Sequence, residues 1–231
     1  MSGLFAPSML VMLALGVTVA ALGLVLSKTI PPWLMSRFDE EPEQAEADPP
    51  VVLPAIPARW LDAVLGLLLA GLSVWLLRTW GLGLKSLSLM FFCLLTLTLA
   101  HIDSRTGLLP DVLTLPLLVA GLTLHSASGW SAAATAFAGA ALGYGLLRVV
   151  FSLYYWKTGR AGMGQGDFKL AAALGAWLGV QTVPMLLLLS SVAGVIAGLG
   201  ALMLKRLPQG SAIPFGPFLA VASILLLLWG Q

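Results

Sequence analysis

Two aspartates stand beside long apolar runs in a chain that carries few other charges. Asp103 follows the run 84–102, and Asp167 follows the glycine-rich turn 162–166. Two close carboxyl groups can hydrolyse a peptide bond, because their mutual repulsion keeps one protonated while the other is ionised. The ionised group takes a proton from water, and the protonated group donates to the carbonyl oxygen. We therefore predict a catalytic aspartate pair that needs no metal and no cofactor for proteolysis. Since such a pair titrates as a unit, neither role is assigned to one residue.

Glycines precede Asp167 in the sequence. Gly162, Gly164 and Gly166 remove side chains around Asp167, so the backbone can take unusual angles and lie close to an extended substrate. The apolar run that begins at residue 168 predicts a helix start there, and a helix N-terminus favours an ionised carboxylate.

Other polar residues near the helix ends have plainer interpretations. Arg105 and Lys169 could tune the aspartates or bind substrate, but basic residues that flank a span are common. Asp111 and Asp62 are each predicted to lie in the first turn of a helix, with a structural role. A single aspartate at a membrane helix end is usually a cap or a solvated charge, so the prediction depends on the pair.

The two histidines are predicted to be structural. His101 is two residues from Asp103, which puts it on a different face of the helix. His125 lies near the opposite end of the next span.

The composition is that of an integral membrane protein. Hydrophobic residues make up 59% and charged residues 10% of the chain, and the mean hydropathy is +0.97. Backbone groups in lipid must be satisfied internally, so the spans should be helices. We expect an all-α, polytopic membrane helical bundle of about eight transmembrane segments, the sixth short enough to be a partial span. The apolar runs are 4–27, 60–79, 84–102, 112–127, 131–154, 168–181, 184–204 and 213–230.

Charge and cysteine content exclude several other classes. A net charge of +2 is too small to indicate a nucleic-acid partner, and the lipid bilayer is the expected surroundings. The single cysteine, Cys93, excludes an intramolecular disulfide and a zinc site built from several cysteines. No basic residue precedes Lys28, so residues 4–27 are expected to be a retained first span rather than a signal peptide.

The distribution of basic residues predicts the orientation. The odd-numbered connections hold nine basic residues and the even-numbered ones two. The positive-inside rule then places the odd loops in the cytoplasm and both termini outside. Asp103 and Asp167 both lie on odd connections, so both are expected on the cytoplasmic side. The nine residues are Lys28, Arg37, Arg59, Arg105, Lys157, Arg160, Lys169, Lys205 and Arg206.

The chain divides into two predicted parts. Residues 1–59 hold the first span and an acidic, proline-rich cytoplasmic loop at 28–59, which is typical of a solvated linker. Residues 60–231 would form the transmembrane peptidase domain. The many glycines of spans five to seven indicate close helix packing.

Three blocks of the sequence resemble the type IV prepilin peptidases. They are 102–116 (IDSRTGLLPDVLTLP), 159–170 (GRAGMGQGDFKL) and 213–218 (IPFGPF), and the resemblance covers roughly residues 84–230. It implies a GxGD-type intramembrane aspartic endopeptidase of the bacterial inner membrane whose catalytic residues fall on Asp103 and Asp167. It further implies cleavage of the basic leader of prepilins or type II secretion pseudopilins at the cytoplasmic face.

The resemblance is weaker in the N-terminal region. Many members carry two cysteine pairs that bind zinc after the first span and also methylate the new N-terminus. Loop 28–59 has no cysteine, so that zinc site is absent and methylation stays open. S-adenosylmethionine would be a cofactor only if methylation is retained. The identity of the substrate and the oligomeric state are not indicated.

Two other functions fit a membrane chain with carboxylates. Carboxylates of ion or proton transporters ordinarily lie near mid-membrane, whereas these lie at span ends. A non-catalytic pilus or secretion assembly protein would be expected to lose an aspartate or the glycine turn, and the chain keeps both.

Overall fold

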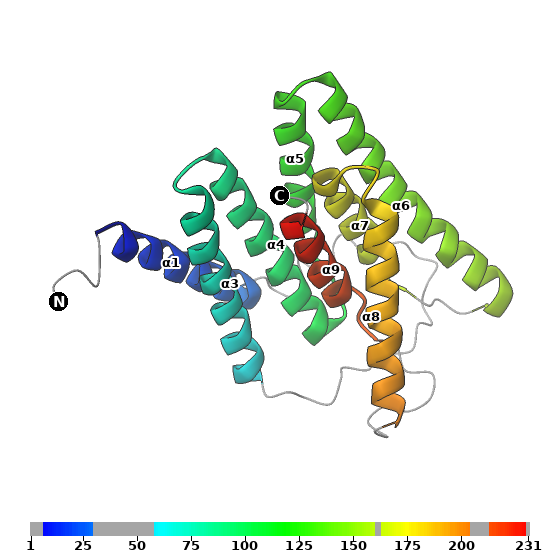
Figure 1. The fold of residues 1–231 in the computed structure, drawn as a ribbon. Helices are drawn as coiled ribbons and strands as arrows, with labels where there is room; N and C mark the ends of the chain where they lie inside the picture. Colours follow the sequence, from blue (N-terminus) through cyan, green and yellow to red (C-terminus); the bar gives the residue numbers. More distant parts are fainter. Residues whose placement is uncertain (1–6, 30–57, 160–162, 204–212, 230–231) are drawn as a thin grey trace.

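The computed structural model describes residues 7–29, 58–159, 163–203 and 213–229. This part of the chain forms eight α-helices and no strand (Figure 1), which confirms the predicted all-α fold. Gly162 and most of loop 28–59 lie outside it. The helices are α1 Pro7–Thr29, α3 Ala58–Trp80, α4 Leu84–Thr106, α5 Asp111–Ala127, α6 Trp130–Thr158, α7 Gln165–Leu178, α8 Val183–Met203 and α9 Gly216–Trp229.

The helices have the length and composition of membrane spans. Four of the described helices, α3, α4, α6 and α8, are long and apolar enough to cross a bilayer, and α5, α9 and the described end of α1 are shorter apolar helices. Large apolar side chains are exposed on their outer faces, as expected where lipid replaces water as the solvent. The chain is therefore a polytopic membrane helical bundle.

The predicted sixth span is a short internal helix. Helix α7 has 14 residues and would be about 21 Å long, less than the roughly 30 Å of a bilayer core. Ten of these residues are buried, because α5, α6 and α9 pack around it. The helix is thus shielded from lipid and positioned by its neighbours.

Close packing of α6 on α7 depends on glycine. A β-carbon on Gly139 would collide with the backbone of Gly175, and one on Gly143 with the backbone of Ala171. The predicted small-residue packing is confirmed at these positions.

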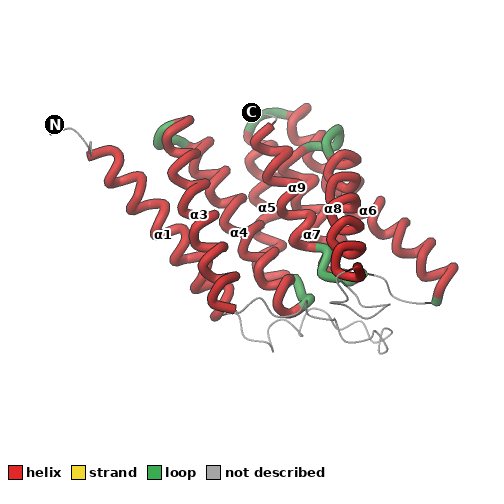
Figure 2. The backbone as a smooth tube through the Cα atoms, turned by 60° about the horizontal axis from the view of Figure 1, so that its bottom comes forward, coloured by secondary structure: helices red, strands yellow, loops and turns green. Residues whose placement is uncertain are grey.

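The described connections lie at opposite ends of the bundle. The connections α3–α4, α5–α6 and α7–α8 lie at one end, and the α4–α5 turn and the start of α7 lie at the other (Figure 2). Asp103 near the end of α4 and Asp167 near the start of α7 therefore share one end of the molecule. The third helix at this site is α9, which packs between α4 and α8 and also touches α7.

Candidate active site

Asp103 lies in the last turn of α4 and is 3% exposed. The helix ends because Gly107 takes a left-handed conformation (φ 67°), in which its N–H donates to the Asp103 carbonyl at 2.8 Å. Pro110 then caps the N-terminus of α5. The turn predicted from Gly107 and Pro110 is therefore present, and it holds the aspartate at the end of a span.

The Asp103 carboxyl group receives a hydrogen bond from α9. The backbone N–H of Gly216 donates to Asp103 Oδ2 at 2.9 Å. Gly216 is the first residue of α9, so its N–H has no partner within its own helix. A β-carbon at this position would lie 2.6 Å from Oδ2, so only glycine lets the backbone approach so closely.

The contact of Gly216 with Asp103 was not foreseen from the sequence. The block 213–218 carries part of the family resemblance, but its sequence indicates no role for its glycine. The available signal was the Pro-Phe-Gly-Pro segment just before an apolar run, because such a segment marks a helix start. It could not reveal which carboxyl group the helix start would meet.

Asp167 is the third residue of α7 and is 7% exposed. The helix begins at Gln165, three residues earlier than the apolar pattern indicated, with Gly164 as its N-cap. The backbone N–H of Asp167 donates to the Gly164 carbonyl at 3.3 Å. The Oδ1 atom is buried and accepts no hydrogen bond within the described residues.

The two carboxyl groups are neighbours in space. Asp103 and Asp167 lie close enough for a direct electrostatic interaction. Their segments also touch beside them, because Gly166 packs against Leu109 of the α4–α5 turn. The structure thus brings together the two residues that the sequence analysis paired.

The glycines of the turn act through their size rather than through their backbone angles. Gly164 has ordinary extended angles (φ −77°, ψ 153°), and Gly166 lies within α7. The expectation of unusual angles is therefore wrong at these two positions. A β-carbon on Gly166 would lie 2.8 Å from the Leu109 β-carbon, so this glycine is needed for close approach. Gly162 lies outside the described residues.

The two basic residues proposed for the site each have an acidic partner outside the aspartate pair. Lys169 Nζ lies 2.7 Å from Asp111 Oδ2, which joins the start of α7 to the start of α5. Arg105 Nη1 lies 3.5 Å from Asp62 Oδ1. Asp111 does lie in the first turn of α5, as predicted, but its pairing with Lys169 was not anticipated. A role of either cation in substrate binding stays a prediction.

The histidines have structural contacts. His101 Nε2 lies 3.0 Å from Asp62 Oδ1, away from the aspartate pair. His125 Nδ1 lies 2.9 Å from the Gly121 carbonyl within α5. Both contacts agree with the predicted structural roles.

Side chains that could bind a metal ion are not clustered in the described part of the chain. No group of three or more His, Cys, Asp or Glu side chains that could hold a metal ion occurs in the described ranges. Cys93, the only cysteine of the chain, is buried in α4. A zinc site with two cysteine pairs therefore cannot be built from this chain.

Comparison with known proteins finds a family match over the segment that carries both aspartates. The model of the type IV leader peptidase family matches residues 90–199, a stretch that contains both aspartates. This stretch of the chain belongs to the type IV leader peptidase family. No solved structure matches the chain.

Named relatives of this family are similar over most of the chain. The prepilin leader peptidase/N-methyltransferase of Aeromonas salmonicida is 44% identical over 177 residues, which are 77% of this chain and 60% of the relative. Those of Pseudomonas aeruginosa and Xanthomonas campestris are 45% and 40% identical, over 68% and 69% of this chain and 49% and 54% of the relatives. The chain thus matches about half to three fifths of the length of these relatives.

Proposed function

We propose that the chain is a membrane aspartic endopeptidase that removes the leader from prepilins or pseudopilins. The observation that carries the proposal is the pairing of two buried carboxyl groups, Asp103 and Asp167, at one end of a membrane helical bundle. Membership of the leader peptidase family over residues 90–199 and the names of the similar proteins support the class of substrate.

Cleavage proceeds by attack of water on the scissile carbonyl. One aspartate of the pair is ionised and takes a proton from the water as its oxygen bonds to the carbonyl carbon. The other is protonated and donates to the carbonyl oxygen, which gives a neutral tetrahedral intermediate. Collapse of the intermediate breaks the C–N bond, and the leaving amine takes a proton from the carboxyl group that the water had protonated. The other carboxylate takes back a hydroxyl proton as the new carbonyl group forms, which restores the starting protonation of the pair. Two carboxyl groups supply every proton transfer in this sequence, so the proteolytic step uses no cofactor.

The reaction takes place at the cytoplasmic face of a bacterial inner membrane. The excess of basic residues on the odd-numbered connections supports this side. The shared position of both aspartates at the bundle end that carries the α4–α5 turn is consistent with it. On this orientation both termini lie outside.

The position of the two aspartates along their helices distinguishes this function from that of a transporter. Asp103 is the fourth residue from the C-terminal end of α4, and Asp167 is the third residue of α7. A relay carboxylate would be expected near the middle of a span. A terminal position suits a peptide that enters from the membrane surface.

The test uses purified protein, a candidate prepilin and mass measurement of the product. Asp103→Asn and Asp167→Asn should each reduce cleavage by at least about a thousandfold, because each removes one proton transfer at nearly constant shape. Asp39→Asn, in the acidic loop, is the control for loss of a carboxylate and should cleave normally. Full cleavage by either active-site variant would refute the mechanism. Addition of EDTA should leave cleavage unchanged, and one extra methylene in the product would report methylation.

A further inference from the structure

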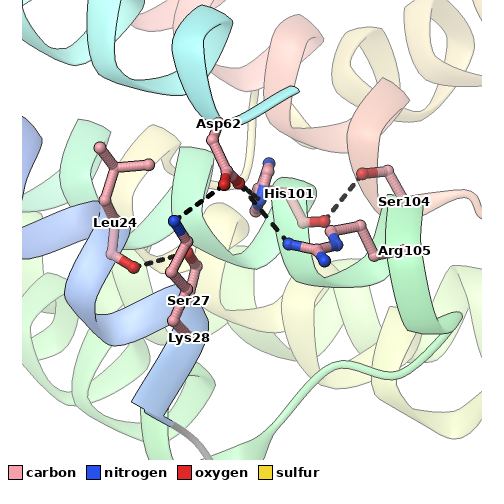
Figure 3. A network of polar contacts seen from close by, with 7 residues as sticks. All are labelled: Leu24, Ser27, Lys28, Asp62, His101, Ser104 and Arg105. Atoms are coloured by element: carbon pink, nitrogen blue, oxygen red, sulfur yellow. Dashed lines mark hydrogen bonds and ion pairs between the residues drawn. The ribbon is translucent and has the colours of Figure 1, made fainter. Parts of the chain in front are cut away.

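Asp62, near the start of α3, is contacted by three basic side chains from two other helices. Lys28 Nζ of α1 lies 2.9 Å from Asp62 Oδ2, and two residues of α4 approach Oδ1 (Figure 3). His101 Nε2 lies at 3.0 Å and Arg105 Nη1 at 3.5 Å from that oxygen. We call these four residues the Asp62 cluster.

The cluster lies on the opposite side of α4 from the candidate active site. His101 and Arg105 are four residues apart and therefore share one face of the helix. Asp103 stands midway between them, about 200° around the helix axis from each. Its carboxyl group meets Gly216 of α9 on that other face. One short stretch of α4 is thus held from both sides.

The N-terminal helices reach the active site through this stretch. Helices α1 and α3 pack against each other and against α4, and α4 then contacts α5 and α9. The matched family segment begins at residue 90, after both N-terminal helices. Asp62 and Lys28 therefore lie outside that segment, while their partners on α4 lie inside it.

The three contacts to Asp62 differ in how much each can contribute to holding α4 in place. Lys28 is 57% exposed, and an exposed ion pair contributes little. Arg105 is farther from Asp62 and is partly exposed. His101 is only 5% exposed, and its Nε2 lies 3.0 Å from Asp62 Oδ1, an ion-pair distance at which the two atoms do not meet at hydrogen-bond angles. The contact between Asp62 and His101 is therefore the most buried of the three ion-pair contacts, and it adds to the apolar packing of α3 on α4.

We propose that Asp62 is a positioning residue, which acts through His101 to fix the rotation of α4 that presents Asp103 to Asp167. The proposal rests on the proposed aspartate mechanism. A side chain lies about 5 Å from the helix axis, so a rotation of α4 by about 10° would move the Asp103 carboxyl group by about 1 Å. A displacement of that size can cost about a hundredfold in rate.

The experiment measures kcat and KM for variants of both residues. Asp62→Asn and His101→Phe should each lower kcat about tenfold or more and leave KM within about twofold, because the substrate still binds. Asp62→Glu and His101→Gln keep an acceptor and a donor, respectively, and should recover part of the loss. The double variant, Asp62→Asn with His101→Phe, should be no slower than the slower single variant, since both changes break the same link. Lys28→Gln is the matched control and should stay near wild type.

Thermal unfolding in detergent, measured on each variant, separates positioning from loss of fold. A wild-type kcat in Asp62→Asn would overturn the proposal, as would losses that multiply in the double variant or that follow the folded fraction alone. If Asp62→Asn does not fold, His101→Phe and His101→Gln decide by the same criteria. Failure of the proposed function is a separate result, in which Asp103→Asn or Asp167→Asn retains full cleavage.

Discussion

Gly216→Ala gives a direct test of the contact between α9 and the active site. The new β-carbon would lie 2.6 Å from Asp103 Oδ2 and 3.0 Å from Cγ, whereas ordinary van der Waals contact begins at 3.4 Å. One of the two groups must therefore move by about 0.8 Å. Alanine is otherwise well suited to the first turn of a helix, and Gly216 does not have the left-handed backbone that would disfavour it. The expected effect comes from the contact with Asp103 and not from strain in α9.

A shift of 0.8 Å in a catalytic carboxyl group has a predictable kinetic consequence. Misplacement of a reacting group by about 1 Å can cost about a hundredfold, so kcat should fall by about ten- to a hundredfold. The loss should appear in kcat rather than in KM, because the new β-carbon meets the reacting carboxyl group itself. The hydrogen bond from the Gly216 N–H would lengthen as the two groups separate.

The assay compares leader cleavage rates of Gly216→Ala and of a matched glycine variant. Gly145→Ala, in α6, would place its β-carbon in open space, with no heavy atom within 4 Å. This control should cleave at the wild-type rate and be slightly stabilised, since alanine favours a helix by up to about 1 kcal/mol over glycine. A wild-type kcat for Gly216→Ala, at normal thermal stability, would refute the inference that this glycine sets the position of Asp103.

Two further predictions concern contacts between helices. Asp111 and Lys169 form an ion pair at 2.7 Å, and breaking it by Asp111→Asn or Lys169→Met should lower the free energy of unfolding by about 1–3 kcal/mol. The double variant should lose less than the sum of the two single losses. Additive losses of unfolding free energy would contradict a direct pair. Gly139→Ala should destabilise the protein by about 1–3 kcal/mol in a thermal unfolding assay, because its β-carbon would meet the Gly175 backbone. Gly71→Ala is the control and should be neutral in the same assay, because its β-carbon faces open space. Equal stability of these two alanine variants would argue against close packing of α6 on α7.

Much of the fold could be predicted because a membrane chain has a strong local signal. Apolar runs of span length require helices in lipid, so the eight helices of the described ranges follow the runs closely. The aspartate pair could also be predicted, since each of its members stands at a span end beside a glycine-containing turn. Their proximity is now a structural observation, while their catalytic role stays a prediction.

The contacts that hold the aspartates in place could not be read from the sequence. Gly216 and Asp103 are 113 residues apart, and Lys169 and Asp111 are 58 apart. Asp62 had the features of an ordinary first-turn aspartate, and only helix packing shows that it meets His101. Such pairings depend on how helices are arranged and rotated relative to each other, which local hydrophobic patterns do not specify.

The placement of the aspartates at helix ends has a physical reason. In a bilayer the backbone groups within a helix are already paired, so a buried carboxyl group finds free backbone donors only where a helix begins. At α9 this donor is the Gly216 N–H, which the missing side chain brings to 2.9 Å from Asp103 Oδ2. Asp167, by contrast, stands within the first turn of its own helix, where the backbone dipole favours negative charge. Asp103 itself lies at the C-terminal end of α4, where the backbone dipole disfavours negative charge, so the starts of α9 and α7 supply the backbone groups that favour ionised carboxylates at this site.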